Sequence, residues 1–199
     1  MSAASFSGYL AGILGSIFIW PQVVRVYARG NVEGVSGASQ LVSLSGTMMW
    51  LAYGIGTDSL PMVLSNANIE IALLAITAML VRKKVVELWL PVTVVGVSVM
   101  FATLFARTSP GVIGMVGVVI GTPSIFPQLL RAVRTKRLYG VSIWSNLLLA
   151  SMGTSWFVHG IIIGDPLVSY PNLVLVPSAS FIAWRAWRSR SASLSVLAA

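Results

Sequence analysis

The sequence contains the same unit twice. Residues 17–25 read IFIWPQVVR and residues 124–131 read SIFPQLLR, so a Pro-Gln-x-x-Arg pattern recurs 106 residues further along the chain (127 − 21). The same spacing, without a gap, relates further identical pairs, which are Gly8/Gly114, Gly15/Gly121, Gly34/Gly140, Val35/Val141, Ser36/Ser142, Ser39/Ser145, Trp50/Trp156, Gly54/Gly160 and Asn66/Asn172. Self-similarity at a fixed period indicates a repeated structural unit. We therefore expect the chain to fold as two related halves.

The composition places these halves in a membrane. With 56% hydrophobic and 9% charged residues, the chain lacks the roughly 25% charged residues that soluble domains carry. A helix needs about 20 mostly apolar residues to cross a bilayer, and the sequence contains seven such runs, near residues 5–27, 37–56, 60–81, 86–106, 111–133, 141–163 and 166–187. The sequence therefore predicts an all-α membrane protein with seven transmembrane helices. No basic segment precedes the first run, so we expect a retained helix and not a cleaved signal peptide.

Positive charge is concentrated on one side of the predicted helices. If the seven helices alternate in direction, twelve of the 13 basic residues fall on the same side, namely Arg25, Arg29, Arg82, Lys83, Lys84, Arg131, Arg134, Lys136, Arg137, Arg185, Arg188 and Arg190. Arg107 alone falls on the other side. The positive-inside rule makes the basic side cytoplasmic, with the N-terminus outside, in a membrane that we expect to be a bacterial-type plasma membrane. Topology thus explains the net charge of +8, and no nucleic-acid partner is expected.

The repeat and the helix count together predict the organisation of the chain. Residues 5–81 hold the first three helices, 82–110 a linker with the fourth, 111–187 the last three, and 188–199 a flexible cytoplasmic tail. Three crossings end on the side opposite to their start, so the second copy points the same way as the first only if one more helix intervenes. We therefore expect two parallel three-helix repeats, related by an axis along the membrane normal and joined by an inversion linker helix.

Each repeat carries a proline and a glutamine inside its first helix. Pro21 and Pro127 cannot donate hydrogen bonds to the carbonyls four residues before them, so these helices are expected to kink or flex. The amides of Gln22 and Gln128 are candidates to bond the freed carbonyls, since unpaired backbone groups are costly in lipid. A hinge in each repeat is the functional interpretation, and a static bend is the alternative.

A tryptophan and an asparagine recur at a fixed separation in both halves. Trp50 and Asn66 each lie about eight residues from a predicted turn near residues 57–58, or about 12 Å deep at about 1.5 Å per residue. Trp156 and Asn172 flank the second turn in the same way. Near the pseudo-two-fold axis, the indoles would offer flat apolar faces and the amides would donate and accept hydrogen bonds. This chemistry suits a neutral polyhydroxy solute, with interfacial tryptophans and interhelical asparagine bonds as the alternative.

This combination resembles the PQ-loop superfamily, and within it the SWEET and SemiSWEET sugar transporters. The resemblance extends from Gly8 to about Arg188 and rests on the duplicated Pro-Gln motif with both tryptophan and asparagine pairs. It implies two triple-helix bundles joined by a linker helix, and alternating access without an energy source. It also implies hinges at Pro21 and Pro127 and substrate contacts at Trp50, Asn66, Trp156 and Asn172.

One acidic residue is expected inside the membrane. Glu70 lies in the middle of the third predicted helix, one turn from Asn66, and its counterpart in the second repeat is Val176. An ionisable side chain at this depth is a functional candidate, and here a proton site. A proton-coupled exporter of an amino acid or similar metabolite, as among the cystinosin-like PQ-loop relatives, is therefore an alternative function. A structural glutamic acid bonded to a neighbouring helix is the other interpretation.

Four polar residues near the outer turns are candidates for a gate. Tyr53 and His159 occupy equivalent places one turn beyond the tryptophans, and Asp58 and Asp165 lie in the two turns. Pairing between them would close the outer end, whereas interfacial tyrosine and turn-forming aspartate are the simpler interpretation. With no cysteine in the chain and no acid-rich cluster near it, His159 gives no support for a metal site.

The sequence thus predicts a SWEET-like facilitative transporter of a small neutral solute, a mono- or disaccharide, that works by alternating access in the lipid bilayer. The alternatives are the proton-coupled exporter that uses Glu70 and a non-transporting receptor on the same fold. The sequence contains no catalytic dyad, phosphate-binding loop or cofactor motif, so neither an enzyme nor a cofactor is expected. It allows a homo-oligomer, although a seven-helix chain needs no second copy to complete a pocket.

Overall fold

The computed structural model describes residues 2–33, 35–135, 138 and 141–197, with side chains as far as Arg190. These residues form helices and turns, with no strand among them. In chain order the helices are α1 (Ala3–Arg29), α2 (Gly37–Gly56), α3 (Leu60–Arg82), α4 (Trp89–Phe105), α5 (Pro110–Gly121), the 3₁₀ helix η1 (Thr122–Ile125), α6 (Phe126–Arg134), α7 (Ile143–Ile163), α8 (Pro166–Ser169) and α9 (Asn172–Leu197). The fifth predicted span comprises α5, η1 and α6, and the seventh comprises α8 and α9. Gly34, Gly140, Lys136 and Arg137 lie outside the described residues.

Most of these segments have the length and composition of membrane spans. Within the described residues, five qualify: Ala3–Arg29, Leu60–Arg82, Pro110–Arg134, Ile143–Ile163 and Pro166–Arg190. The 17-residue α4 is a shorter apolar helix. The 20-residue α2 contains serine, threonine and the buried Gln40. Gln40 donates to the carbonyl of Leu73 and to the hydroxyl of Thr77 on α3. The side-chain amide of Gln40 therefore has hydrogen-bond partners inside the protein.

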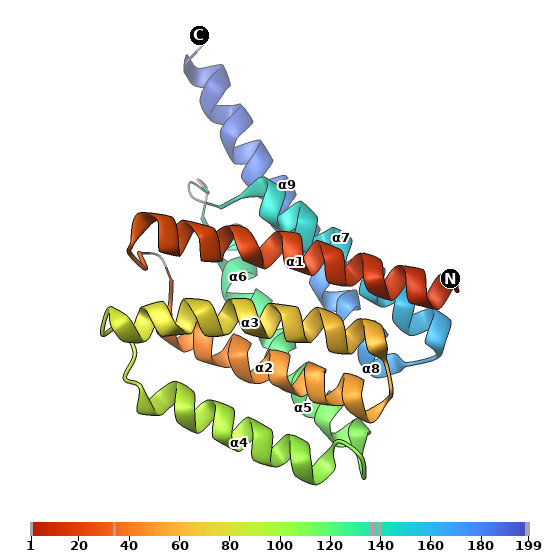
Figure 1. Ribbon diagram of the computed structural model, residues 1–199. Coiled ribbons are helices and arrows are strands. Elements are labelled where there is room, and N and C mark those ends of the chain that lie inside the picture. The colour runs from red at the N-terminus through yellow and green to blue at the C-terminus, as the bar shows by residue number, and fades with distance from the viewer. Residues whose placement is uncertain (1, 34, 136–137, 139–140, 198–199) are drawn as a thin grey trace.

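The two halves have the same internal order of helices. In the first half α3 packs between α1 and α2 (Figure 1), and in the second half α9 packs against both α6 and α7. The halves meet along two seams, α1 against α7 and α2 against α5. In the duplication α1 corresponds to the fifth span and α2 corresponds to α7. The seam between α1 and α7 is therefore equivalent to the seam between α5 and α2. The linker helix α4 packs on α2 and α5 at the edge of the molecule.

The two ends of the molecule differ in character. The N-terminus and the turns at residues 57–59, 106–109 and 164–165 lie together at one end, here called the turn end. The opposite end, here called the basic end, contains the ends of α1, α3 and α6, which are Arg29, Arg82 and Arg134. This separation of basic residues from the turn end follows the alternation of helix direction that the sequence predicts.

Identical residues of the two repeats mark equivalent helix starts. Ser36 and Ser142 precede α2 and α7, and each hydroxyl accepts a hydrogen bond from the backbone N–H of the serine three residues later, at 3.3 and 3.1 Å. A serine cap of this kind satisfies one of the N–H groups left free at a helix start. The repeated Val-Ser-x-x-Ser segment therefore has a local structural role in both halves.

Two repeated glycines allow the helices to approach closely at the seams. A Cβ added to Gly8 would lie 3.0 Å from the ring of His159, and one added to Gly114 would lie 2.9 Å from the ring of Tyr53. Small residues at such crossings permit tight packing of membrane helices. His159 and Tyr53 are themselves repeat counterparts, so the two seams have the same packing.

The two proline-containing helices differ. α1 runs through Pro21 as one helix, whereas its counterpart is interrupted by η1 between α5 and α6. The second repeat carries Pro123 one turn before Pro127, so two successive turns lose an N–H donor. The carbonyl of Pro123 accepts instead from the N–H of Phe126, and the amide of Gln128 is not needed to bond it. The two proline-containing spans are therefore one continuous helix, α1, and one helix that η1 interrupts.

The seventh segment is also divided. Pro171, which has no N–H, lies between α8 and α9. The carboxylate of Asp165 caps α8 by accepting from the N–H of Leu167 at 2.9 Å. α9 runs to Leu197, so residues 188–197, expected to belong to a flexible tail, continue the helix.

Candidate binding cavity

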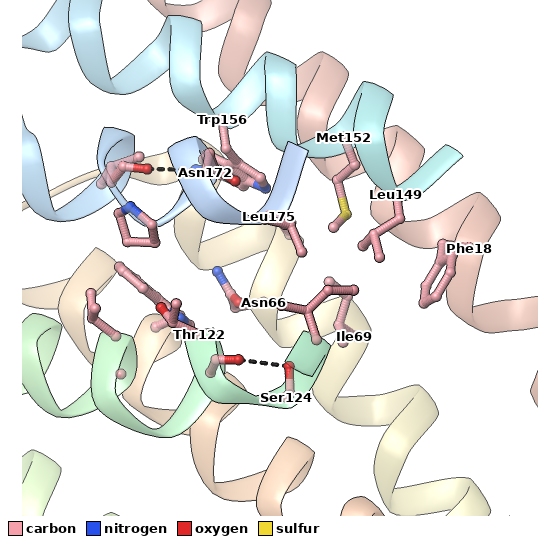
Figure 2. A pocket seen from close by; sticks show the side chains of 18 of the residues that line it. Phe18, Asn66, Ile69, Thr122, Ser124, Leu149, Met152, Trp156, Asn172 and Leu175 are labelled. Atoms are coloured by element: carbon pink, nitrogen blue, oxygen red, sulfur yellow. Dashed lines mark hydrogen bonds between the residues drawn. The ribbon is translucent and has the colours of Figure 1, made fainter. Parts of the chain in front are cut away.

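A cavity of about 400 Å³ lies between the two halves. Its wall is built from the six spans of the two repeats, and among the described residues α4 contributes nothing to it. The volume falls within the roughly 300–1,000 Å³ range of small-molecule pockets. The wall includes the four side chains predicted to contact a substrate, Trp50, Asn66, Trp156 and Asn172, the last three labelled in Figure 2.

The two asparagines have equivalent environments. Both are buried, and each donates one amide N–H to the carbonyl four residues earlier, Asn66 to Met62 at 2.9 Å and Asn172 to Val168 at 2.8 Å. A carboxamide has two N–H donors and a carbonyl acceptor. Each amide therefore keeps one N–H and its oxygen for a further partner in the cavity.

The two tryptophans are placed in equivalent ways as well. Trp50 packs edge to face with Tyr53 at a centroid distance of 5.8 Å, and Trp156 packs in the same way with His159 at 5.5 Å. Both indoles are half-buried. The aromatic pairs place each tryptophan on the cavity side of a second ring that lies closer to the turn end.

A hydrogen bond connects the two halves across one seam at the turn end. Tyr53, which is buried, donates its hydroxyl to Oδ2 of Asp165 at 2.6 Å. The other carboxylate oxygen, Oδ1, accepts from the backbone N–H groups of Leu167 and Val168 at the start of α8. The bond therefore joins α2 of the first half to a capped turn of the second half.

The other seam is closed by different chemistry. His159 is also buried, and its Nδ1 lies 2.8 Å from the carbonyl oxygen of Ala4 and 3.4 Å from the hydroxyl of Ser7 on α1. Because the carbonyl can only accept, we assign the proton to Nδ1. Nε2 is buried and has no partner among the described residues. The equivalent tyrosine and histidine thus reach different acceptors across the two seams.

Asp58 is not part of this closure. Its side chain is 82% exposed and lies 3.4 Å from the guanidinium of Arg107, which is 71% exposed. Asp58 corresponds to Gly164 in the repeat, whereas Asp165 corresponds to Ser59, so the two acids differ by one residue in register. The structure therefore brings Tyr53 and Asp165 together and leaves Asp58 at the surface.

The cavity reaches toward the basic end. Its wall there includes Phe18 and Ser124, both of which are exposed, as well as Gln128. The buried Tyr53 and His159 at the turn end have no such exposure. Of the four predicted hinge residues, Gln128 lines the cavity, and the described wall does not include Pro21, Gln22 or Pro127.

Glu70 lies outside the cavity wall. Its side chain is 7% exposed, and neither carboxylate oxygen has a hydrogen-bond partner in the described part of the chain. Asn66, one turn earlier on α3, lines the cavity, but Glu70 is not among the lining residues. The predicted proton site and the predicted substrate contacts are therefore neighbours in the sequence that do not share the cavity.

The cavity wall is neutral and contains two buried hydroxyl groups without partners in the described structure that the sequence does not single out. No charged side chain lines it among the described residues. Ser65 and Thr122 line it, and the hydroxyl oxygen of each is buried without a partner in the described structure. The sequence signal that could have identified these two residues is their position. Ser65 directly precedes Asn66, and Thr122 directly precedes Pro123, where the helix breaks.

Comparisons with known proteins agree with this architecture. A family model of the PQ loop repeat matches residues 3–63. The sugar transporter SemiSWEET of Leptospira biflexa serovar Patoc is 32% identical over 59 residues, which are 30% of this chain and 69% of that protein. The chain belongs to the PQ-loop family of SWEET and SemiSWEET proteins.

Longer SWEET relatives match most of this chain. The bidirectional sugar transporters SWEET11 and SWEET13 of Oryza sativa subsp. japonica are 23% and 25% identical to it over 195 and 185 residues. These matches cover 87% and 85% of the chain but 64% and 60% of the rice proteins, so the SWEET-family chain spans less than two thirds of their length.

A solved structure shows the same fold. A eukaryotic SWEET transporter matches with a TM-score of 0.75 at 18% identity, over 96% of this chain and 100% of the other. The predicted all-α arrangement, two three-helix repeats with a linker helix, is thereby confirmed for this SWEET-family chain.

Proposed function

We propose that this SWEET-family chain is a facilitative transporter of a small neutral solute, a mono- or disaccharide. The observation that carries the proposal is the cavity at the junction of the halves, where two indoles and two amides meet without a charged side chain among the described lining residues. The relatives named as sugar transporters support the choice of solute and of a transporter over an enzyme.

The cavity chemistry favours a neutral polyhydroxy molecule. A charged group that leaves water needs a partner of opposite charge or several strong hydrogen bonds, and this wall provides no charged partner among its described residues. The amides of Asn66 and Asn172 each retain donor and acceptor capacity for hydroxyl groups. The flat apolar faces of Trp50 and Trp156 suit the C–H face of a sugar ring.

Transport would proceed by alternating access. The Tyr53–Asp165 bond closes the turn end, and the exposed wall residues lie toward the basic end. By the positive-inside rule the basic end is cytoplasmic and the N-terminus lies outside, in a plasma membrane of bacterial type. Under this proposal, the structure would represent an inward-facing state. Rocking of the halves about Pro21 and the broken helix at Pro127 would open the turn end.

All residues proposed to contact the solute come from one chain, so a single copy is sufficient for binding. The test is uptake of labelled glucose and sucrose into proteoliposomes, with and without a pH gradient. Wild-type protein should take up one of them without a gradient, and Asn172→Ala should reduce uptake about tenfold, the effect of losing one to two hydrogen bonds. Asn31→Ala, in an exposed loop, is the matched control. Absence of sugar flux in folded wild-type protein contradicts the proposal.

A second candidate function rests on the isolated Glu70. A carboxyl group buried without a partner among the described residues is costly in a membrane, so its presence there makes it a functional candidate. A proton-coupled exporter of an amino acid or similar metabolite would use it. The position of Glu70 outside a cavity wall without charges favours the sugar transporter, because an amino acid brings two charged groups that need partners.

The two functions differ in their response to Glu70→Gln. A facilitative transporter should show the same dependence on an imposed pH gradient before and after the substitution, whereas an exporter should lose its gradient dependence. The exposed Glu87→Gln is the matched control. If the protein is a receptor on the same fold, added sugar would quench its tryptophan fluorescence, but the same liposomes would show no sugar uptake.

A further inference from the structure

Two hydroxyl groups of the cavity wall are buried without a hydrogen-bond partner among the described residues, unlike several helical hydroxyls elsewhere in the chain. Those of Ser16, Ser124, Ser151 and Thr154 donate to carbonyls three or four residues earlier. Those of Ser65 and Thr122 do not, and no described residue bonds to either. A buried hydroxyl without a partner is costly, and in a native structure its retention needs a reason.

Both hydroxyls are placed to reach a bound solute. Ser65, on α3, directly precedes Asn66, and Thr122 is the first residue of η1, where the fifth span breaks. Figure 2 shows Thr122, Asn66 and Asn172 at the cavity on three different elements. Each oxygen lies within the wall, with almost no accessible surface. A change of χ1 to another staggered rotamer would move each oxygen without breaking a hydrogen bond to a described residue.

The hydroxyls also break the symmetry of the cavity. The tryptophan and asparagine pairs are related by the duplication, so by themselves they present the same groups to a solute in either of two orientations. The counterpart of Ser65 is Pro171, which lines the cavity without a hydroxyl. The counterpart of Thr122 is Ser16, whose hydroxyl donates to the carbonyl of Gly12 and accepts from Asn68. Unpartnered hydroxyls are therefore present at only one of each pair of equivalent positions.

We propose that Ser65 and Thr122 are specificity-determining residues, each of which hydrogen-bonds one hydroxyl group of the solute and which together select one of the two orientations. The proposal rests on the proposed function, since it requires a neutral polyhydroxy solute in this cavity. A site built to bond a particular hydroxyl discriminates against an analogue that lacks it. The duplicated residues then supply the general affinity for a sugar, and the two unpartnered hydroxyls supply the selection.

The test is competition by a series of monodeoxy sugars against uptake of the labelled parent sugar in proteoliposomes. In wild-type protein, two different deoxy positions should compete more weakly than the parent, by roughly threefold to tenfold each, as expected for one neutral hydrogen bond. Ser65→Ala should remove discrimination at one position, and Thr122→Val should remove it at the other. In each variant the parent should weaken to the level of the corresponding deoxy sugar.

Controls separate selection from folding. Ser151→Ala and Thr103→Val change hydroxyls that already donate to carbonyls of their own helices on the exposed surface, and both should keep the wild-type pattern. Thr122→Ser keeps the hydroxyl and should restore discrimination lost in Thr122→Val. Melting temperatures of the purified variants detect misfolding, and a variant that misfolds is replaced by Ser65→Gly or Thr122→Ala, which remove the same hydroxyls.

The outcomes distinguish this proposal from the proposed function. If wild-type protein transports sugar, loses uptake in Asn172→Ala, and the Ser65 and Thr122 variants both keep the full wild-type deoxy pattern, this proposal alone is overturned. If wild-type protein neither transports nor binds a sugar, the proposed function fails, and this proposal fails with it. Loss of discrimination at the same position in both variants would contradict the assignment of one solute hydroxyl to each residue.

Discussion

The hydrogen bond from Tyr53 to Asp165 can be removed by deleting a single oxygen atom. Tyr53→Phe deletes the hydroxyl that donates to Oδ2 of Asp165 at 2.6 Å and keeps the ring that packs against Trp50. The substitution leaves the buried packing of the turn end in place. Under the proposed alternating access, its effect should fall on the equilibrium between closed and open turn ends, because the bond would join the two halves only in the closed state.

The size of the effect follows from the partners of Asp165. Hydrogen bonds to charged groups contribute about 1.5–3 kcal/mol, with the larger values where a charge is left unpaired. In this case Oδ1 keeps the N–H groups of Leu167 and Val168, so the carboxylate stays partly satisfied. We therefore expect about 1.5 kcal/mol, which is about a tenfold increase in the open population.

The chain contains no cysteine, which allows a single reporter thiol. Val168 is buried and lines the cavity, so a thiol introduced by Val168→Cys reacts with a membrane-impermeant maleimide from the turn end only when that end opens. When opening and closing are fast, the labelling rate is proportional to the open population. Tyr53→Phe should raise that rate about tenfold, in line with the calculated loss.

Two controls accompany this measurement. Tyr170→Phe changes an exposed tyrosine near the same end, and Asp58→Ala removes an acid whose exposed pair with Arg107 should contribute less than about 1 kcal/mol. Neither should change the labelling rate of the thiol at position 168. An unchanged rate in Tyr53→Phe would refute the assignment of this bond as the closure of the turn end.

Two further substitutions test the packing and capping of the repeats. Gly114→Val should destabilise the protein by about 1–3 kcal/mol through overpacking, because even a Cβ there would lie 2.9 Å from both Leu167 and Tyr53. Gly111→Val, on the same helix with open space around it, should show no comparable fall in thermal stability, and an equal fall would contradict the packing explanation. Ser142→Ala should lower stability by about 1 kcal/mol by removing the cap of α7, and an unchanged melting curve would show that the cap contributes nothing.

Much of the fold could be predicted because the residues that are identical in the two repeats have local structural roles, such as capping a helix or allowing two helices to pack closely. Ser36 and Ser142 recur because each caps a helix, and Gly8 and Gly114 recur because each permits a close crossing. Requirements of this kind depend on a few neighbouring atoms and are therefore visible in sequence. The coarse architecture follows from them together with the length of the apolar runs.

The broken helix shows where prediction by repeat equivalence ends. Pro21 and Pro127 are equivalent in sequence, yet only the second helix is interrupted. The difference comes from Pro123, whose counterpart is not a proline, because two missing donors in successive turns favour a 3₁₀ segment where one does not. Equivalence between repeats therefore predicts common features, and departures from it have to be examined residue by residue.

The candidate site was predictable in its duplicated part. Residues 16 positions apart in both halves, a tryptophan and an asparagine, come together in one cavity because the repeats pack about a common axis. The unduplicated part was not predictable. Whether Glu70 faces the cavity depends on the rotation of α3 about its own axis, and a shift of one residue decides that Asp165, and not Asp58, reaches Tyr53.

By itself the sequence determined that this is a membrane protein of two repeats with a linker helix, because composition, apolar run length and periodicity are properties of the chain alone. Only the tertiary structure decided which polar groups share the cavity and which are left without partners. That selection depends on the angles at which helices from distant parts of the chain pack. The four duplicated residues, Ser65 and Thr122 line the cavity, whereas Glu70 and Asp58 do not.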